Sequence, residues 1–177
     1  MFAMRLATAA DAPAVENLIL ARCAWMDGQG IPSWRESVAD LVRQTENADD
    51  DMWVLEEDSG RIIGCTTVQE QTPPWEWTER ELSEPADYLY TTVTDPAYRR
   101  RKPGTVIALW AVDRAAREGK EWVRRGCHFR GLVNYYGTQG FTLVHVVRRT
   151  NSRVYLMARR AEPIVDLDQK FKALGQL

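Results

Sequence analysis

The sequence predicts a mixed α/β domain, with a central β-sheet of about seven strands flanked by about four helices. Apolar residues recur with the helical period in some segments and alternate with the strand period in others. The 177 residues suffice for one well-cored domain, and the 45% hydrophobic and 27% charged fractions are those of a globular protein. We expect a single domain over residues 1–177, with its core at 4–160 and a polar C-terminal tail at 161–177.

The first elements are a strand at residues 4–7 and a long helix. Thr8 and Asp11 have the spacing of a capping box at the start of that helix. The apolar residues at helical spacing are Val15, Leu18, Ile19, Cys23 and Met26. Gly28 and Gly30 predict its end.

A second helix is expected at residues 34–45, with Ser33 as its cap. Strand-like segments follow at 52–57 and 62–69, separated by a hairpin turn at 58–60. Residues 70–85 are rich in Pro, Trp and acidic residues, so we expect a loop there.

The second half begins with a strand at residues 87–94 and a helix at 105–118 that carries a stripe of mostly small apolar residues. A strand at 121–127 and a helix at 130–139 come next, and strands at 141–149 and 152–159 complete the domain. The predicted order is β-α-α-β-β-β-α-β-α-β-β.

A basic segment joins the strand at 87–94 to the following helix. It reads Arg99-Arg100-Arg101-Lys102-Pro103-Gly104. The N-terminus of a helix offers unpaired N–H groups and a partial positive charge, which together favour an anion such as pyrophosphate. The segment lacks the glycine pattern of a P-loop or a dinucleotide fold, and a solvated loop is the alternative.

A second notable segment, which is aromatic, lies about 30 residues after the basic one. Tyr136 precedes Gly140 by four residues, and Phe141 follows the glycine. Taken alone, this pattern is that of core tyrosines at the end of a helix.

Together the two segments resemble the motifs of the GNAT (Gcn5-related N-acetyltransferase) superfamily. The element order agrees from Met4 to about Arg159. The residues that carry the resemblance are Val93, Asp95, Pro96, Tyr98, Arg99, Gly104, Tyr136, Gly140 and Phe141.

The resemblance implies an N-acetyltransferase that transfers an acetyl or another small acyl group from acetyl-CoA to a primary amine, in a ternary complex. It implies that the strands at 87–94 and 121–127 part to admit CoA, with pantetheine along Thr92 and Val93. It also places the pyrophosphate at the basic segment, whose candidate residues are Arg99, Arg100, Arg101, Lys102, Gly104 and Thr105. Tyr136 would protonate the departing thiolate.

Two departures from the family pattern concern the phosphate contacts. Lys102 stands where the family has a glycine, so it must adopt a backbone conformation that glycine often supplies. Pro103 has no N–H to donate. A non-catalytic CoA-binding or sensing module is therefore the first alternative.

The amine side is less marked. Glu70, Tyr90 and also Asp87 are candidates for the general base. Trp75 and Trp77, which lie among acidic residues, and Trp34 are candidates for contacts with a cationic acceptor. The acceptor would be a small molecule or a peptide amine, and packing of these side chains onto the core is the alternative.

Other classes find less support. The net charge of −2 argues against a nucleic-acid-directed protein, although the arginine cluster keeps that alternative open. No His, Cys, Asp and Glu set has metal-ligand spacing, and no apolar run is long enough for a membrane helix. Three cysteines without a disulfide pattern fit a reducing cytoplasm, and the strand-rich C-terminal half could support a homodimer. The early segment with Trp25, Gly30 and Trp34 resembles bacterial members of the GNAT superfamily.

Overall fold

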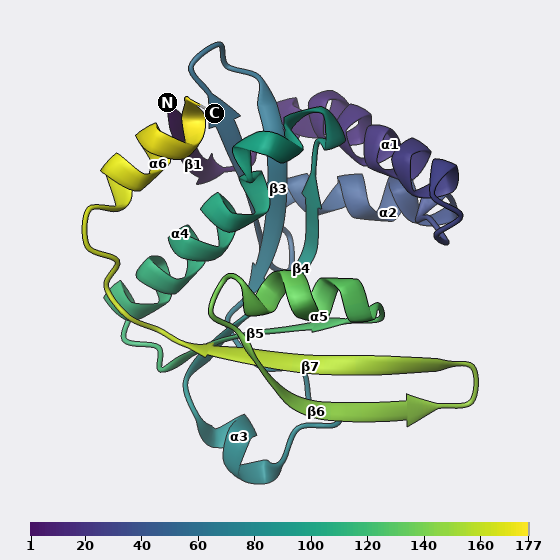
Figure 1. The fold of residues 1–177 in the computed structure, drawn as a ribbon, viewed down its shortest axis with the longest axis vertical. Helices are drawn as coiled ribbons and strands as arrows, with labels where there is room; N and C mark the ends of the chain where they lie inside the picture. Colours follow the sequence, from purple (N-terminus) through teal and green to yellow (C-terminus); the bar gives the residue numbers. More distant parts are fainter. Residues whose placement is uncertain (177) are drawn as a thin grey trace. The chain divides into compact units, whose positions relative to one another are not determined.

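The computed structural model describes residues 1–176 and contains a seven-stranded mixed sheet in the order β1-β2-β3-β4-β5-β7-β6 (Figure 1). β4 and β5 are parallel, whereas β1–β2, β2–β3, β5–β7 and β6–β7 are antiparallel. The strands are β1 (Phe2–Leu6), β2 (Asp51–Glu57), β3 (Ile62–Gln69), β4 (Ala86–Thr94), β5 (Trp122–Cys127), β6 (Thr142–Arg149) and β7 (Ser152–Arg160). The predicted mixed α/β fold is confirmed.

The predicted order of the strands is also confirmed. The α-helices are α1 (Ala12–Gly28), α2 (Val38–Arg43), α3 (Glu79–Ser83), α4 (Pro103–Arg117), α5 (Arg130–Gly137) and α6 (Leu167–Gly175). Helices α1, α2, α4 and α5 lie where helices were expected, whereas α3 and α6 were not predicted. Short 3₁₀ helices are η1 (Ala9–Asp11), η2 (Arg35–Ser37), η3 (Gln44–Glu46) and η4 (Pro96–Arg101). No helix among residues 1–176 is long and apolar enough to cross a membrane.

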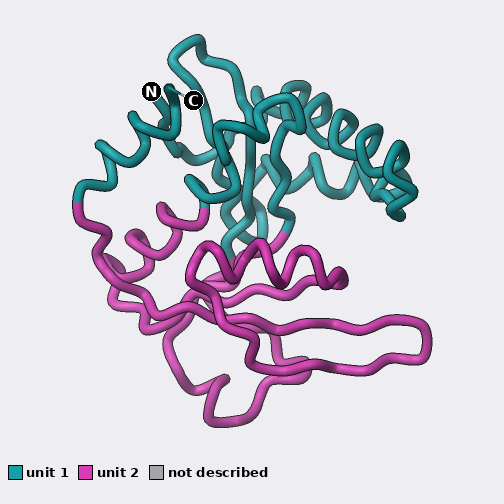
Figure 2. Tube along the Cα trace, in the orientation of Figure 1, with its two compact units in different colours: residues 1–68, 91–107, 166–177 teal, residues 69–90, 108–165 magenta. Residues whose placement is uncertain are grey.

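The chain forms two compact units, which Figure 2 shows in different colours. Unit 1 comprises residues 1–68, 91–107 and 166–177, and unit 2 comprises residues 69–90 and 108–165. The expected single domain stays a prediction.

Strand β3 organises the core of unit 1 because its side chains alternate between two faces. Cys65 belongs to the apolar cluster that α1 and α2 form with β2 and β4. The neighbouring Gly64 faces α4, and a Cβ at this glycine would lie 3.0 Å from Cδ1 of Ile107. The glycine therefore lets the start of α4 lie close to the sheet.

The N-terminal predictions for unit 1 are confirmed in part. Thr8 and Asp11 form the capping box, and α1 ends at Gly28. The single helix expected at 34–45 is wrong, because η2, α2 and η3 divide that segment. Ser33 is not a cap, since Trp34 and Ser37 hold the N-cap positions of η2 and α2.

The segment 161–177, expected to be a polar tail, contains a helix in its second half. Residues Leu167–Gly175 form α6, which packs beside β1 in unit 1. Phe171 is only 6% exposed and anchors the helix. Leu167, Phe171 and Leu174 recur at helical spacing, so this helix was readable from the sequence, but the polar residues around them favoured a tail.

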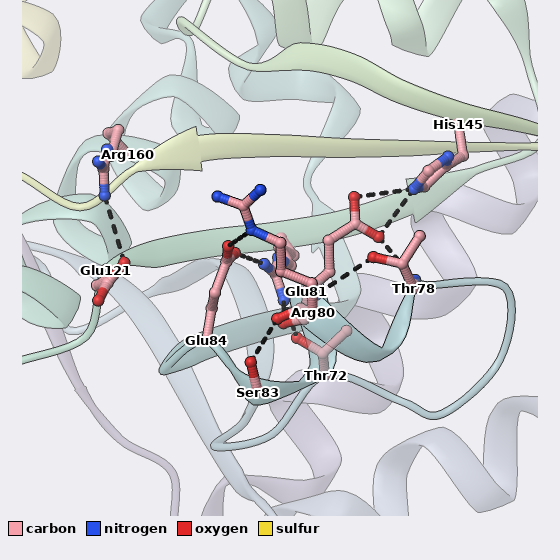
Figure 3. A network of polar contacts seen from close by, with 10 residues as sticks. Thr72, Thr78, Arg80, Glu81, Ser83, Glu84, Glu121, His145 and Arg160 are labelled. Atoms are coloured by element: carbon pink, nitrogen blue, oxygen red, sulfur yellow. Dashed lines mark hydrogen bonds and ion pairs between the residues drawn. The ribbon is translucent and has the colours of Figure 1, made fainter.

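Unit 2 contains the other helix that the sequence pattern did not predict. Within residues 70–85, expected to be a loop, Thr78 and Glu81 form a capping box that starts α3. Both carboxylate oxygens of Glu81 lie 2.9 Å from Nε2 of His145 on β6 (Figure 3). The capping box and the histidine together hold α3 on the strands of unit 2.

Arg124 of β5 is the buried polar centre of this contact. Its guanidinium donates to the Glu81 carbonyl and to a carboxylate oxygen of Glu84, each at 2.6 Å. It also lies 4.9 Å from the ring centroid of Trp77. Burial lowers the pKa of Arg124, and the charge of Glu84 opposes that shift.

We expect Arg124→Ala to lower the free energy of unfolding by about 3 kcal/mol, because it leaves a carboxylate and a carbonyl without their buried donor. Arg80 provides the matched control, since it faces the same Glu84 at 3.9 Å but its side chain is 91% exposed. Arg80→Ala should cost less than about 0.5 kcal/mol. Urea unfolding measures both, and equal costs would contradict a central role for Arg124.

Candidate functional site

Strand β4 loses its partner β5 partway along its length. The parallel ladder joins Ala86 through Leu89 to Trp122 through Arg125, and β4 continues to Thr94. Just beyond the ladder Thr91 has a φ of 44°. A positive φ is rare for a β-branched residue, and such strain is concentrated at functional sites. The β4–β5 ladder ends at Leu89, two residues before Thr91.

Thr92 and Val93 follow the strained residue in unit 1. The Thr92 hydroxyl lies 2.8 Å from that of Thr66 on β3. Val93 is 2% exposed and belongs to the apolar cluster with α1 and α2. Because both side chains pack against other residues of unit 1, we expect a ligand to contact the backbone groups of Thr92 and Val93.

The basic turn, residues 95–105, connects β4 to α4. Asp95 caps η4 by accepting the Ala97 N–H at 2.9 Å and also pairs with Arg61 at 3.0 Å. At the other end of η4, Lys102 has φ 48° and ψ 52°, the left-handed conformation. The prediction that Lys102 must take a glycine-like backbone is confirmed.

The N-terminus of α4 follows directly from this left-handed residue. The Lys102 carbonyl accepts the N–H groups of Thr105 at 2.9 Å and Val106 at 3.2 Å. Pro103 occupies the first helical position, where an N–H has no intrahelical acceptor and proline is favoured. The Lys102 N–H donates to Arg99 at 3.2 Å, so two of the predicted phosphate donors already have partners. Gly104, in the same first turn, is buried, and its N–H is one of those that a helix leaves without an intrahelical acceptor.

The cations of the basic turn have different roles. Arg99, Arg100 and Lys102 are exposed. Arg101 instead forms a 2.8 Å ion pair with Glu57 of β2, which also accepts a 2.9 Å bond from Tyr98. Burial alone would raise the pKa of Glu57, but these hydrogen bonds outweigh it and lower the pKa.

Tyr136, the predicted acid, lies on α5 in unit 2 and is 9% exposed. The guanidinium of Arg125 stacks on its ring, 3.7 Å from the centroid. Gly140 has a φ of 84°, and the reversal lets the Phe141 N–H donate to the Tyr136 carbonyl at 3.1 Å. The Tyr-Gly-Phe pattern therefore reflects a helix end that fixes the tyrosine.

Arg125 is the residue of this group that the sequence did not reveal. It is 3% exposed, and its Nε has no hydrogen-bond partner among the described residues. A buried cation normally requires compensation, which here comes from the faces of Tyr136 and Phe141. Only its position on β5, opposite an aromatic helix end, could have indicated this contact.

Two of the candidate bases share a group of charges in unit 2. Asp87 is buried beside Arg114 at 3.0 Å and Lys120 at 3.8 Å. Burial raises the pKa of Asp87, and the two cations oppose that shift. Lys120 also donates to the Glu70 carbonyl at 3.3 Å, while the Glu70 residue is exposed. Tyr90, three residues along β4 from Asp87, is half-buried.

The three candidate tryptophans differ in exposure. Trp77 is 7% exposed, with Arg124 over its ring and the ring of His145 at 5.7 Å in an edge-on contact. Trp75, also in unit 2, is 68% exposed, and Trp34 in unit 1 is 38% exposed. Trp75 and Trp34 can thus meet a ligand, whereas the main contacts of Trp77 are with its own unit. Among residues 1–176 no cluster of three His, Cys, Asp or Glu could hold a metal.

Lys102→Gly should raise the free energy of unfolding by up to about 1 kcal/mol, because glycine removes the cost of a left-handed side-chain-bearing residue. The matched control is Arg100→Gly in η4, which is exposed and lacks a positive φ. That change should cost about 0.5–1 kcal/mol. Thermal and urea unfolding give both values, and a loss of stability in Lys102→Gly would contradict the assigned strain.

Comparison with known proteins accords with this geometry. Residues 19–141 match the family model described as Acetyltransferase (GNAT) family. A search of curated proteins gives no match.

Solved structures show the same fold. A GNAT acetyltransferase from Listeria monocytogenes is 16% identical, with a TM-score of 0.69 over 90% of this chain and 94% of the other. PaiA N-acetyltransferase from Thermoplasma acidophilum in complex with coenzyme A is 18% identical, with a TM-score of 0.63 over 90% and 99%. A variant of the spermidine N-acetyltransferase SpeG from Vibrio cholerae is 13% identical, with a TM-score of 0.65 over 94% and 98%. Because the family model covers more than half of the sequence, this chain belongs to the GNAT family of acetyltransferases.

Proposed function

We propose that this chain transfers an acetyl or another small acyl group from acetyl-CoA to a primary amine, by direct attack in a ternary complex. The observation that carries the proposal is the basic turn, where left-handed Lys102 starts α4 beside exposed cations. A helix N-terminus of this kind binds phosphate through directed N–H groups as well as charge. Membership of the GNAT family supplies the reaction class.

The basic turn would bind the pyrophosphate of CoA. Gly104 offers the backbone N–H, and the exposed cations Arg99, Arg100 and Lys102 supply the charge. Pantetheine would run along the backbone of Thr92 and Val93, beyond the end of the β4–β5 ladder. The structure of PaiA with coenzyme A supports this cofactor class.

Tyr136 is the proposed general acid for the leaving thiolate. A phenol suits this task because the reference pKa values of phenols and thiols lie within about two units. The stacked Arg125 and the adjoining Phe141 hold the ring in one orientation. The amine also needs a base, for which Glu70 and Tyr90 remain the proposed residues.

The acceptor is proposed to be a cationic amine, either a small molecule or a peptide. SpeG, a spermidine acetyltransferase, offers one precedent for such a substrate within the fold. Trp75 and Trp34 are exposed and able to receive a cation on their rings, while Trp77 would contribute less. A cytoplasmic location is proposed from three buried free cysteines, and the homodimer stays a prediction.

A CoA-binding protein without efficient transfer is the second candidate. It is favoured by Pro103, which lacks an N–H, and by the Thr105 and Lys102 amides that already have acceptors. Normal CoA binding, with no loss of thioester over a broad panel of amines, would select this candidate.

Acetyl-CoA should raise the melting temperature of the protein, because a ligand that binds only the folded state stabilises it. At a hundredfold excess over Kd the gain is about 2.7 kcal/mol. The measurement is thermal unfolding with and without millimolar acetyl-CoA, with free adenosine as the control. No shift would rule out the proposed cofactor.

Tyr136→Phe should lower kcat by about 10²-fold while leaving the Kd for CoA unchanged, because only the acidic hydroxyl is removed. The matched control is Tyr135→Phe, since that neighbouring side chain is 38% exposed. Steady-state kinetics and calorimetric titration separate the two quantities. An unchanged kcat in Tyr136→Phe would reject the proposed acid.

A further inference from the structure

Arg101 differs from the other cations of the basic turn because its contacts are all within unit 1. One terminal nitrogen pairs with Glu57 at 2.8 Å, and the other donates to the carbonyl of Gly175. Its guanidinium also lies 4.6 Å from the ring centroid of Phe2 and 5.6 Å from that of Tyr98. Arg101 is therefore occupied by structural contacts and not open to a phosphate.

Gly175 is the last residue of α6, and its carbonyl is one of the acceptors that a helix leaves unpaired at its C-terminus. The partial negative charge at this end of a helix favours a cation. A Cβ at Gly175 would lie 3.6 Å from the Arg101 guanidinium, which shows how closely the two segments approach. Helix α6 thus contributes a contact that a surface tail would not make.

The apolar side of α6 carries the buried Phe171 and the half-buried Leu167 and Leu174. Phe171 is the buried side chain of the helix, at 6% exposed, and the helix packs beside β1. Phe2 of β1 is 3% exposed and lies beneath the Arg101 guanidinium. Phe171 and Arg101 therefore belong to one local assembly in unit 1, although they are 70 positions apart in the sequence.

The contacts of Arg101 also affect Lys102, the next residue of the basic turn. Arg101 directly precedes Lys102, whose left-handed backbone starts α4. A left-handed residue that carries a side chain is strained and persists when its surroundings hold it. With its guanidinium fixed by Glu57 and Gly175, Arg101 holds the chain on the N-terminal side of that residue.

We propose that α6 is a positioning element for the cofactor turn and acts through Arg101. The helix holds Arg101, and Arg101 holds Lys102 in the conformation that presents the Gly104 N–H to a diphosphate. The effect on CoA affinity rests on the proposed function, whereas the effect of α6 on the order of the basic turn does not depend on a ligand.

The test compares Phe171→Ala, Arg101→Gln and the double variant with wild type. The matched control is Lys172→Ala, an exposed change on the same helix. One readout is amide hydrogen exchange at Lys102, Gly104 and Thr105 without ligand, and the other is the Kd for CoA by calorimetry, with all proteins folded.

Phe171→Ala should speed exchange in the turn and weaken CoA about fivefold, a size typical of coupling between sites. Lys172→Ala should change neither quantity. The double variant should bind CoA no more weakly than Arg101→Gln alone, because the two residues act in one chain of contacts. If Phe171→Ala does not fold, Phe171→Leu keeps an apolar side chain and serves the same comparison with a smaller effect.

Wild-type exchange and affinity in folded Phe171→Ala would overturn the inference, and so would losses that multiply in the double variant. Failure of the proposed function gives a different result, since wild type itself would then not bind CoA. In that case, amide hydrogen exchange in the basic turn would still show whether α6 orders this turn.

Discussion

The transition from η4 to α4 through left-handed Lys102 is the constraint on which the proposed cofactor end of unit 1 depends. Polar anchors hold this transition at both ends: Asp95 caps η4 and pairs with Arg61, and Arg101 pairs with Glu57. Both partners come from β2 or the residue just before β3, so the sheet fixes where α4 starts. Gly64 then allows that helix to lie close to β3.

Unit 2 uses a different means to fix its candidate catalytic residue. Arg125 is buried without a carboxylate partner among the described residues and stacks on Tyr136. On the other face of β5, Arg124 has hydrogen bonds to α3 and its flanking residues. Adjacent arginines on one strand thus serve opposite faces, as the alternation of a strand requires.

The sequence predicted what depends on periodicity and local chemistry. The element order, the end of α1 at Gly28 and the glycine-like backbone of Lys102 could all be inferred from neighbouring residues. The start of α3 was also readable, since Thr78 and Glu81 have capping-box spacing, but the surrounding Pro and Trp residues favoured a loop. Helix α6 was readable in the same way, since Leu167, Phe171 and Leu174 have helical spacing, but the polar residues among them favoured a tail.

Contacts between distant positions could not be predicted in this way. Nothing near Arg101 indicates that its partners are Glu57 and Gly175, and nothing near Arg125 indicates stacking on Tyr136. These pairings form only when distant segments meet in the folded chain. Arg101 therefore has a structural role, although the sequence does not distinguish it from the exposed Arg99 and Arg100 beside it.

A crystal structure of the protein with CoA would test the proposed phosphate site at the basic turn. We expect a diphosphate oxygen within about 3 Å of the Gly104 backbone nitrogen, with Lys102 still in the left-handed conformation. A diphosphate bound away from the N-terminus of α4 would contradict it, as would a basic turn that changes its backbone to receive the ligand.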